Sequence, residues 1–468
     1  LGVVFYELLA GQLPFQSDDA MELVHAHLAL SPQSPELLNP DIPPLISEII
    51  MKLLRKNAED RYQSSYGLKS DLERCLSSLE RKGKIDAFDL AKNDFSGKLQ
   101  IPQKLYGRQK EIEYLLDAFE RSSQGATELL LVAGYSGVGK SALVHEIHRP
   151  ITQRRGYFIE GKFDQLQRNI PYFAFIQAFK SFAHNLLTEN TKDLERWRVK
   201  IQRAVGNNGR VLTDVMPSLE LIIGPQPEVT HLGASESQNR FNLVFQNFIR
   251  AISSPEHPLV IFVDDWQWAD AASMNLLRIL LTGGYDQYLF IIGAYRVNEV
   301  ESGHPFMMMI EELREEKVAL NILELNNLSL DNLNDLVSDA LSMPPPEVRD
   351  LTELMYHKTQ GNAFFVNQML RSLYEESLLR FDFGTRSWTW DLEQIKALNI
   401  SDNVVDLMAS KVQKLPQATQ NMLKLAACIG NRFNLETLAI VNENNRSEYL
   451  PLIKETLEPA LMEGLIIP

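Results

Sequence analysis

Hydrophobic positions at the start of the chain follow the spacing of amphipathic helices and show none of the alternation typical of strands. Apolar residues recur every three or four positions over Leu1–Leu9, and Gly11 and Pro14 end this pattern. The same spacing predicts three further helices, over Met21–Leu30, Leu45–Leu54 and Ser65–Leu79. We therefore expect residues 1–79 to form a helical domain, followed by a polar linker over residues 80–104.

From residue 105 the pattern changes to short apolar runs separated by helical segments. Continuous apolar runs bounded by polar turns are typical of buried parallel strands. Five runs fit this description: Glu128–Ala133, Tyr157–Lys162, Leu259–Val263, Tyr288–Ala294 and Asn321–Leu325. Strands that alternate with helices predict a parallel sheet covered on both faces, so we expect a five-stranded α/β domain over residues 105–327.

The remaining segments are mostly helical in pattern. Residues 170–252 are interpreted as a helical insertion beside the sheet. Helical spacing returns over residues 328–400, except at Leu379–Trp390, where alternating aromatic residues around a glycine indicate a β-hairpin. Residues 401–468 are again helical in pattern. The fold is thus expected to be multidomain, with the α/β domain between helical ones.

A glycine-rich loop joins the first predicted strand to a helix predicted over Ser141–His148. Its sequence, Gly134-Tyr-Ser-Gly-Val-Gly-Lys140-Ser141, fits the P-loop pattern in the strand–loop–helix context that the pattern requires. The glycines let backbone N–H groups point at phosphate oxygens, Lys140 adds a positive charge, and the Ser141 hydroxyl can ligate Mg²⁺. We predict that ATP and Mg²⁺ bind through Gly134, Ser136, Gly137, Val138, Gly139, Lys140 and Ser141.

Two acidic residues follow the apolar run Leu259–Val263. Asp264 is placed to hold Mg²⁺, directly or through water, and Asp265 to orient or deprotonate the attacking water. Arg296 follows the next predicted strand and could stabilise the charge of the γ-phosphate. It could equally be an ordinary surface arginine, and the sequence leaves both interpretations open.

Composition narrows the class of protein. The formal net charge of −15 argues against a dominant nucleic-acid surface, because phosphate contacts need clustered lysine and arginine. Two cysteines far apart, Cys75 and Cys428, suit a reducing cytoplasm and disfavour a disulfide framework. No apolar run approaches the roughly 18 residues of a membrane span. The chain begins inside a helical pattern and stops after an apolar tripeptide, so we expect it to be a piece of a larger protein.

Several motifs carry a family resemblance. The run Val263–Asp270 is similar to an extended Walker B sequence, Leu105–Arg108 to a hydrophobic-Gly-Arg entry motif, and Thr359–Phe365 to a Gly-Asn-Pro-Phe-Phe stretch in which Ala363 replaces the proline. Together these motifs resemble the STAND class of P-loop NTPases, which is related to AAA ATPases. The resemblance covers about residues 105–468 and implies that Arg108 lies near the adenine. It also implies a helical lid over residues 328–400 and a truncated winged-helix region over residues 401–468.

The first domain carries a second resemblance. Leu1–Phe15 looks like the long central helix of a Ser/Thr protein kinase C-lobe, and Leu54–Tyr62 looks like the late kinase motif that contains a structural arginine, here Arg61. The catalytic and metal-binding residues of a kinase are absent from residues 1–79, so this section cannot transfer phosphate as given. A kinase end joined to a STAND ATPase is similar to large bacterial hybrid sensor kinases.

These resemblances imply an ATP-driven switch in which ATP closes the α/β domain against the helical domain and hydrolysis releases it. The expected partners are ATP, ADP and other domains of a parent signalling kinase, with self-association a further option. Two alternatives stay open. The parent could act mainly as a Ser/Thr kinase with the NTPase as a scaffold, or residues 401–468 could bind DNA, which the net charge disfavours.

Overall fold

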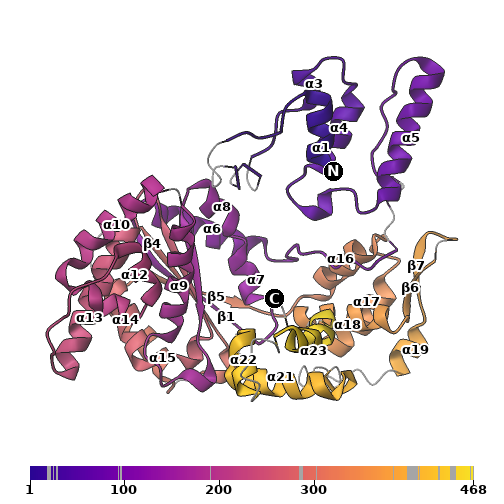
Figure 1. Cartoon of the computed structure of the whole chain (residues 1–468). Coiled ribbons are helices and arrows are strands. Elements are labelled where there is room, and N and C mark those ends of the chain that lie inside the picture. Colours follow the sequence, from indigo (N-terminus) through magenta and orange to yellow (C-terminus); the bar gives the residue numbers. More distant parts are fainter. Residues whose placement is uncertain are drawn as a thin grey trace.

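The computed structural model describes residues 1–17, 23–24, 26–27, 30–92, 94, 97–189, 191–283, 288–301, 303–382, 384–397, 409, 412–430, 433–442, 450–463 and 465–466. Three parts follow one another along the chain (Figure 1). A small group of N-terminal helices lies at the top of the view, a helix-covered sheet at the left, and a second helical part at the lower right. Within the described ranges, no helix is long and apolar enough to cross a membrane.

The central part is built on one parallel sheet. Its strands are β1 (Thr127–Gly134), β2 (Tyr157–Lys162), β3 (Leu259–Asp264), β4 (Leu289–Tyr295) and β5 (Leu320–Leu325). They lie in the order β2-β3-β4-β1-β5, and each neighbouring pair is parallel. All five predicted strands are confirmed, with ends within one residue of the expected ones. Because all strands run the same way, the carboxyl ends of β1 to β4 meet at one edge of the sheet.

Two helical layers cover the sheet, because alternate strand residues face opposite sides. Leu130 and Val132 of β1 join a core with one layer, and Leu129 and Leu131 join a core with the other. The first layer consists of α6 (Gln109–Ser123), α7 (Lys140–His145) and α8 (His148–Gln153). The second layer is larger and contains α9 (Phe173–Leu187), α10 (Thr191–Val205), α11 (Gly209–Thr213), α12 (Pro217–Ile223), α13 (Ala234–Ile252), α14 (Ala271–Thr282) and α15 (Pro305–Glu315). The predicted insertion corresponds to α9–α13.

The helix expected over Ser141–His148 is wrong in its length. α7 ends at His145, and α8 starts at His148 after a short break. Pro150 explains why a new helix begins here: it lies in the first turn of α8, where its missing N–H is not needed, whereas inside one continuous helix it would remove a hydrogen bond.

The N-terminal part contains α1 (Gly2–Ala10), α3 (Pro35–Leu38), α4 (Pro44–Leu53) and α5 (Ser65–Lys82). Gly11 ends α1 in the left-handed conformation, at φ 74°. Half of the residues in the helix expected over Met21–Leu30 lie outside the described residues, so that helix stays a prediction. α5 runs three residues past its expected end, to Lys82, because Arg81 and Lys82 suit the negative end of the helix dipole. The linker then folds back on this part, where the Asp94 carboxylate accepts from the backbone N–H groups of Gln63 and Ser64, at 2.6 and 2.8 Å.

The C-terminal part begins with α16 (Leu330–Leu341), α17 (Arg349–Thr359) and α18 (Ala363–Glu375). The predicted hairpin is confirmed: β6 (Leu379–Asp382) pairs antiparallel with β7 (Ser387–Trp390). Then come α19 (Leu392–Ala397), α21 (Gln417–Ile429), α22 (Leu435–Val441) and α23 (Leu450–Met462), and the last three share a small core. Most of residues 401–411 and 443–449 lie outside the described residues, so the winged-helix region stays a prediction.

A close approach between β2 and α9 fixes the end of β2. A Cβ added at Gly161 would lie 1.9 Å from the carbonyl oxygen of Ala174, in α9. Gly161→Ala must therefore displace the backbone of α9 and should destabilise the domain by about 1–3 kcal/mol or more. Thermal unfolding measures this effect. Gly303→Ala is the matched control, because a Cβ there meets nothing within 4 Å. Equal unfolding midpoints for the two variants would contradict this packing.

Candidate nucleotide-binding site

The glycine-rich loop leaves β1 and enters α7 at the edge where the strands end. Gly137 and Gly139 take φ values of 77° and 102°, a backbone region that side chains with a Cβ rarely adopt. Lys140 is buried, and its ammonium donates to the carbonyl oxygens of Gly134 and Tyr135, at 3.0 and 2.9 Å. Burial lowers the pKa of Lys140, and the charges of Asp264 and Asp265 act in the opposite direction. The loop thus holds the amine close to both acids.

The two acids follow β3 and face different surroundings. Asp265 is only 2% exposed and has a φ of 58°, while its N–H donates to Asp264 Oδ1 at 2.9 Å. Burial and the neighbouring Asp265 charge raise the pKa of Asp264. A cation would reverse that shift, so the Asp264 carboxylate and the Ser141 hydroxyl fit Mg²⁺. Among the described residues no cluster of three or more His, Cys, Asp or Glu side chains could hold a metal by itself.

Both carboxylate oxygens of Asp265 are held by cations from the neighbouring strands. Lys162, the last residue of β2, places its Nζ 2.9 Å from Asp265 Oδ2 and 3.6 Å from Asp264 Oδ2. Arg296, directly after β4, places its Nε 3.1 Å from Asp265 Oδ1, which also accepts from Gln267 at 2.8 Å. Burial works to raise the pKa of Asp265, but Lys162, Gln267 and Arg296 outweigh it and hold that pKa below the ordinary value.

Arg296 is thus joined to the acids and is not an isolated surface residue. Its side chain is three-quarters buried, and its guanidinium bonds Glu299 Oε1 at 2.8 Å and lies over the Trp268 ring at 4.9 Å from the ring centre. Arg108 lies elsewhere. It precedes α6, bonds the carbonyl of Asn326 and pairs with Glu111 at 3.5 Å, and it makes no hydrogen bond or ion pair to the described P-loop residues. Its expected place near an adenine stays a prediction.

The helical part reaches the P-loop through the start of α18. Asn362 caps this helix with its side-chain oxygen, and its amide nitrogen donates to the Ser136 carbonyl at 2.9 Å. The N–H of Phe364 donates to the Gly137 carbonyl at 3.0 Å. A Cβ on Gly137 would lie 2.8 Å from Asn362 and Phe364, so the contact itself needs a glycine. Two loop carbonyls are therefore bonded to a helix more than 200 residues further along the chain.

Sequence reasoning did not identify Lys162, Gln267 or the P-loop contact of Asn362. A signal existed for Lys162, because a lysine that ends a buried parallel strand lies at the same edge as the P-loop. Gln267 had a weaker signal, since it follows the acids by only two residues in a short helical turn, Trp266–Trp268. For Asn362, the only available signal is that an asparagine before an apolar run suits a helix start, and this does not show what that start touches.

With the site at the carboxyl edge of a five-stranded parallel sheet, the central part has the fold of a P-loop NTPase. Residues 104–292 match the family model described as "AAA ATPase domain". This stretch of the chain is therefore similar to AAA ATPase domains.

The chain is similar to curated proteins that are much longer. Hybrid signal transduction histidine kinase G of Dictyostelium discoideum is 34% identical over 545 aligned positions, which cover 99% of this chain and 16% of that protein. A probable serine/threonine-protein kinase of Streptomyces coelicolor is 36% identical over 75 residues, 16% of this chain and 11% of that kinase. Among solved structures, a STAND protein with a tetratricopeptide repeat sensor from Pyrococcus horikoshii has a TM-score of 0.38 at 15% identity, covering 79% of this chain and 41% of that one.

Replacing Lys162 by Met should destabilise the protein by about 1–3 kcal/mol at neutral pH, because a buried carboxylate loses one of its cations. The folded-state pKa of Asp265 is lowered, so its pairing stabilises the fold above the unfolded aspartate pKa of about 3.9. That contribution is lost as the pH falls through the lowered folded value. Urea unfolding of wild type and variant should therefore differ most above about pH 5, and the difference should shrink below about pH 4.

Lys69→Met is the matched control, because Lys69 pairs with Glu73 at 3.6 Å while both side chains are more than 60% exposed. This variant should differ from wild type by less than about 0.5 kcal/mol at every pH. An effect of Lys162→Met that is equally small would show that the buried pair does not stabilise the fold.

Proposed function

We propose that this chain binds ATP with Mg²⁺ and hydrolyses it as the switch module of a larger signalling protein. One observation carries the proposal. A P-loop lysine, two acids and two further cations from four different strand ends lie together at one edge of a domain similar to AAA ATPase domains. The contact of α18 with the P-loop adds a route by which the nucleotide can influence the helical part.

Binding follows from the charges at this edge. The N–H groups of the glycine loop and the N-terminus of α7 favour phosphate oxygens, and Lys140 adds a full charge beside the β and γ phosphates. Ser141 and Asp264 would hold Mg²⁺, which supplies charge neutralisation between the phosphates. Lys162 and Arg296 lie close enough to the acids to turn toward a γ-phosphate that arrives there.

In the proposed hydrolysis, Asp265 acts as the base. The water oxygen forms a bond to the γ-phosphorus, the bond from phosphorus to the bridging oxygen breaks, and ADP leaves with that electron pair. The water proton passes to the Asp265 carboxylate. In the described structure, Lys162 and Arg296 occupy both oxygens of this carboxylate. The γ-phosphate therefore has to draw at least one cation away before Asp265 can accept a proton.

The switch itself uses the junction between loop and helix. Phosphates bound by the N–H groups of Ser136 to Lys140 would reorient the peptide units whose carbonyls bond Asn362 and Phe364. A rotation of a loop peptide therefore changes the position of α18. We infer that this junction transmits the nucleotide state to the helical part.

The parent protein is proposed to be a multi-domain sensor kinase. The similarity to hybrid signal transduction histidine kinase G extends over nearly all of this chain, and a separate similarity to a probable serine/threonine-protein kinase is consistent with the kinase-like motifs of the first 79 residues. The chain spans about a sixth of the Dictyostelium relative. Sensing, phosphate transfer and their targets would belong to the rest of such a protein.

Lys140→Ala should weaken ATP binding at least about tenfold, because a buried charge beside the phosphates is removed. Asp265→Asn should bind ATP about as well as wild type, but hydrolyse it at least about a hundredfold more slowly. Isothermal titration and phosphate release measure the two effects. Lys180→Ala, on the exposed side of α9, is the control that should change neither. Wild-type affinity in Lys140→Ala would rule out the site, and wild-type turnover in Asp265→Asn would remove the role as base.

Asn362→Asp tests the junction. The new carboxylate can still cap α18, but it cannot donate to the Ser136 carbonyl. Hydrogen exchange of α18 should change on ATP binding in the wild type and much less in the variant, while ATP affinity falls less than about tenfold. Asn434→Asp is the matched control, because Asn434 caps α22 by accepting from the N–H of Thr437 at 2.6 Å. An unchanged exchange response in Asn362→Asp would contradict the proposed coupling.

A further inference from the structure

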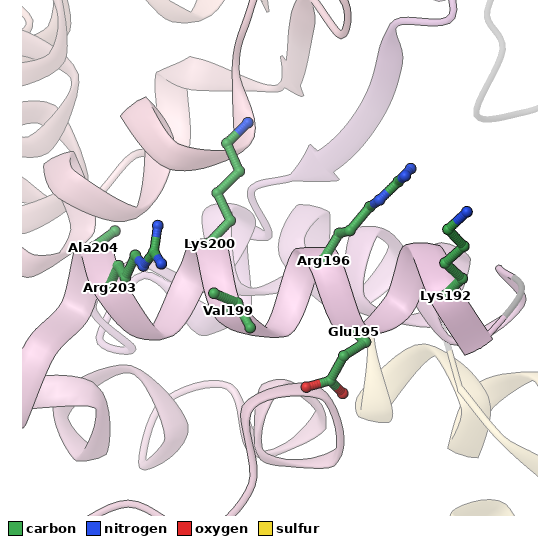
Figure 2. A pocket seen from close by; sticks show the side chains of 7 residues that line it. All are labelled: Lys192, Glu195, Arg196, Val199, Lys200, Arg203 and Ala204. Atoms are coloured by element: carbon green, nitrogen blue, oxygen red, sulfur yellow. The ribbon is translucent and has the colours of Figure 1, made fainter.

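A row of cations lies on the exposed side of α10. Lys192, Arg196, Lys200 and Arg203 follow one another at helical spacing and are all exposed. Figure 2 shows that Lys192, Arg196 and Lys200 point to the same side of the helix. The helix contains five Lys or Arg and two Asp or Glu residues, a net charge of +3 in a chain whose net charge is −15. We call these four residues the basic stripe.

The opposite side of α10 anchors it, so the stripe is held in place. Trp197, Ile201 and Val205 are buried in the core that α10 shares with α12 and α13. Beside the stripe, a wide surface hollow of about 780 Å³ includes Val199 and Ala204 among its lining residues (Figure 2). The lining combines apolar Val199 and Ala204 with the acid Glu195, a mixture that suits a protein surface better than a nucleic-acid backbone.

A matching row of acids lies on α16. Asp331, Asp335 and Asp339 are exposed and follow one another four residues apart, the same spacing that separates Lys192, Arg196 and Lys200. α16 contains no Lys or Arg, so its net charge is −3. The other side of α16 is buried in the core of the helical part through Leu333, Leu336 and Val337. We call these three residues the acidic stripe.

Each stripe places like charges four residues apart, an arrangement that weakens a helix instead of strengthening it. Some members have local partners: Arg196 pairs with Asp193 at 2.8 Å, Asp331 with Arg349 at 2.9 Å, and Asp339 with Lys104 at 3.2 Å. These are exposed pairs of the kind that contributes little and exchanges readily. Lys200, Arg203 and Asp335 form no ion pair with any residue that the structure describes.

Within one molecule the two stripes cannot meet, because α10 and α16 lie on opposite sides of the molecule (Figure 1). We propose that the basic stripe of one copy binds the acidic stripe of a second copy. Each interface joins two different surfaces, so the contact is head-to-tail, and an open assembly keeps a free basic stripe at one end and a free acidic stripe at the other. This inference does not depend on ATP binding or hydrolysis.

Charge reversal on each stripe provides the test. One variant carries Arg196→Glu and Lys200→Glu, and the other carries Asp331→Lys and Asp335→Lys. Asp339 is left intact because it also accepts from Tyr106 at 2.8 Å. Sedimentation velocity of the full chain should show wild-type association at about 0.1 M salt and its loss near 1 M, where charges are screened within about 3 Å. Each variant alone should associate more than about tenfold more weakly than wild type.

The mixture of the two variants is the decisive sample. The first variant keeps its acidic stripe and the second keeps its basic stripe, so neither can bind itself, but the two can bind each other through this unaltered pair of stripes. Mixing them should restore association at low salt, as pairs that contain one copy of each variant. A mixture that stays monomeric would overturn the proposal, as would a wild type that is monomeric at low salt or variants that associate normally. A wild type that stays monomeric while its basic stripe binds an acidic peptide or DNA would overturn it as well.

A cross-linking experiment on the wild type covers the case in which a variant does not fold. A carbodiimide joins a lysine amine to a carboxylate only when the two are in contact. In a mixture of ¹⁵N-labelled and unlabelled chains, peptides that join Lys192 or Lys200 to Asp331, Asp335 or Asp339 should carry one label in half of the cases. Absence of such mixed peptides would contradict the contact between copies.

Discussion

A buried carboxylate needs a counter-charge, and the arrangement of this site depends on that requirement at Asp265. With 2% of its surface exposed, the side chain cannot be solvated by water, and an unpaired charge there would be costly. Its two oxygens are paired by Lys162 and Arg296, which end the strands on either side of β3. The pairing is possible only because β2, β3 and β4 are neighbours and end at the same edge. The order of the strands therefore determines which charged side chains meet at the site.

The same constraint sets the geometry around the P-loop. β1 lies next to β4, so the loop that follows β1 enters the edge where the acids and cations already lie. Gly161 brings α9 against β2, which fixes the position of the neighbouring Lys162. On the far side of the loop, Asn362 and Phe364 bond the carbonyls of Ser136 and Gly137. The charges, the loop and the first turn of α18 therefore form one connected unit.

Sequence pattern predicted the parts of the fold that periodicity determines. Every strand of the parallel sheet was found, because each is a short, largely apolar run between helical segments, and β1, β3 and β4 are buried along almost their whole length. The P-loop was recognised because its glycine spacing carries a mechanism. α7 ends before its predicted end at His148, because Pro150 fits the first turn of the new helix α8 but would disrupt a continuous helix. Lys162 and Asn362 were missed for a different reason. Their roles depend on which residues lie beside them in the folded chain. Local sequence spacing predicts neither the order of the strands nor where a helix packs. The winged-helix region and the place of Arg108 near an adenine remain predictions.

The central claim is that Lys162 and Arg296 hold Asp265 until a γ-phosphate competes for them. Titration of the Asp265 carboxyl by carbon NMR, with aspartate selectively labelled and Asp265→Asn used for assignment, tests it directly. In the protein without nucleotide, the pKa of Asp265 should lie below the ordinary aspartate value. With a non-hydrolysable ATP analogue and Mg²⁺ the pKa should rise, because the cations turn toward the phosphate, whereas ADP should leave it low. A pKa that is the same with the ATP analogue as without nucleotide would contradict the account.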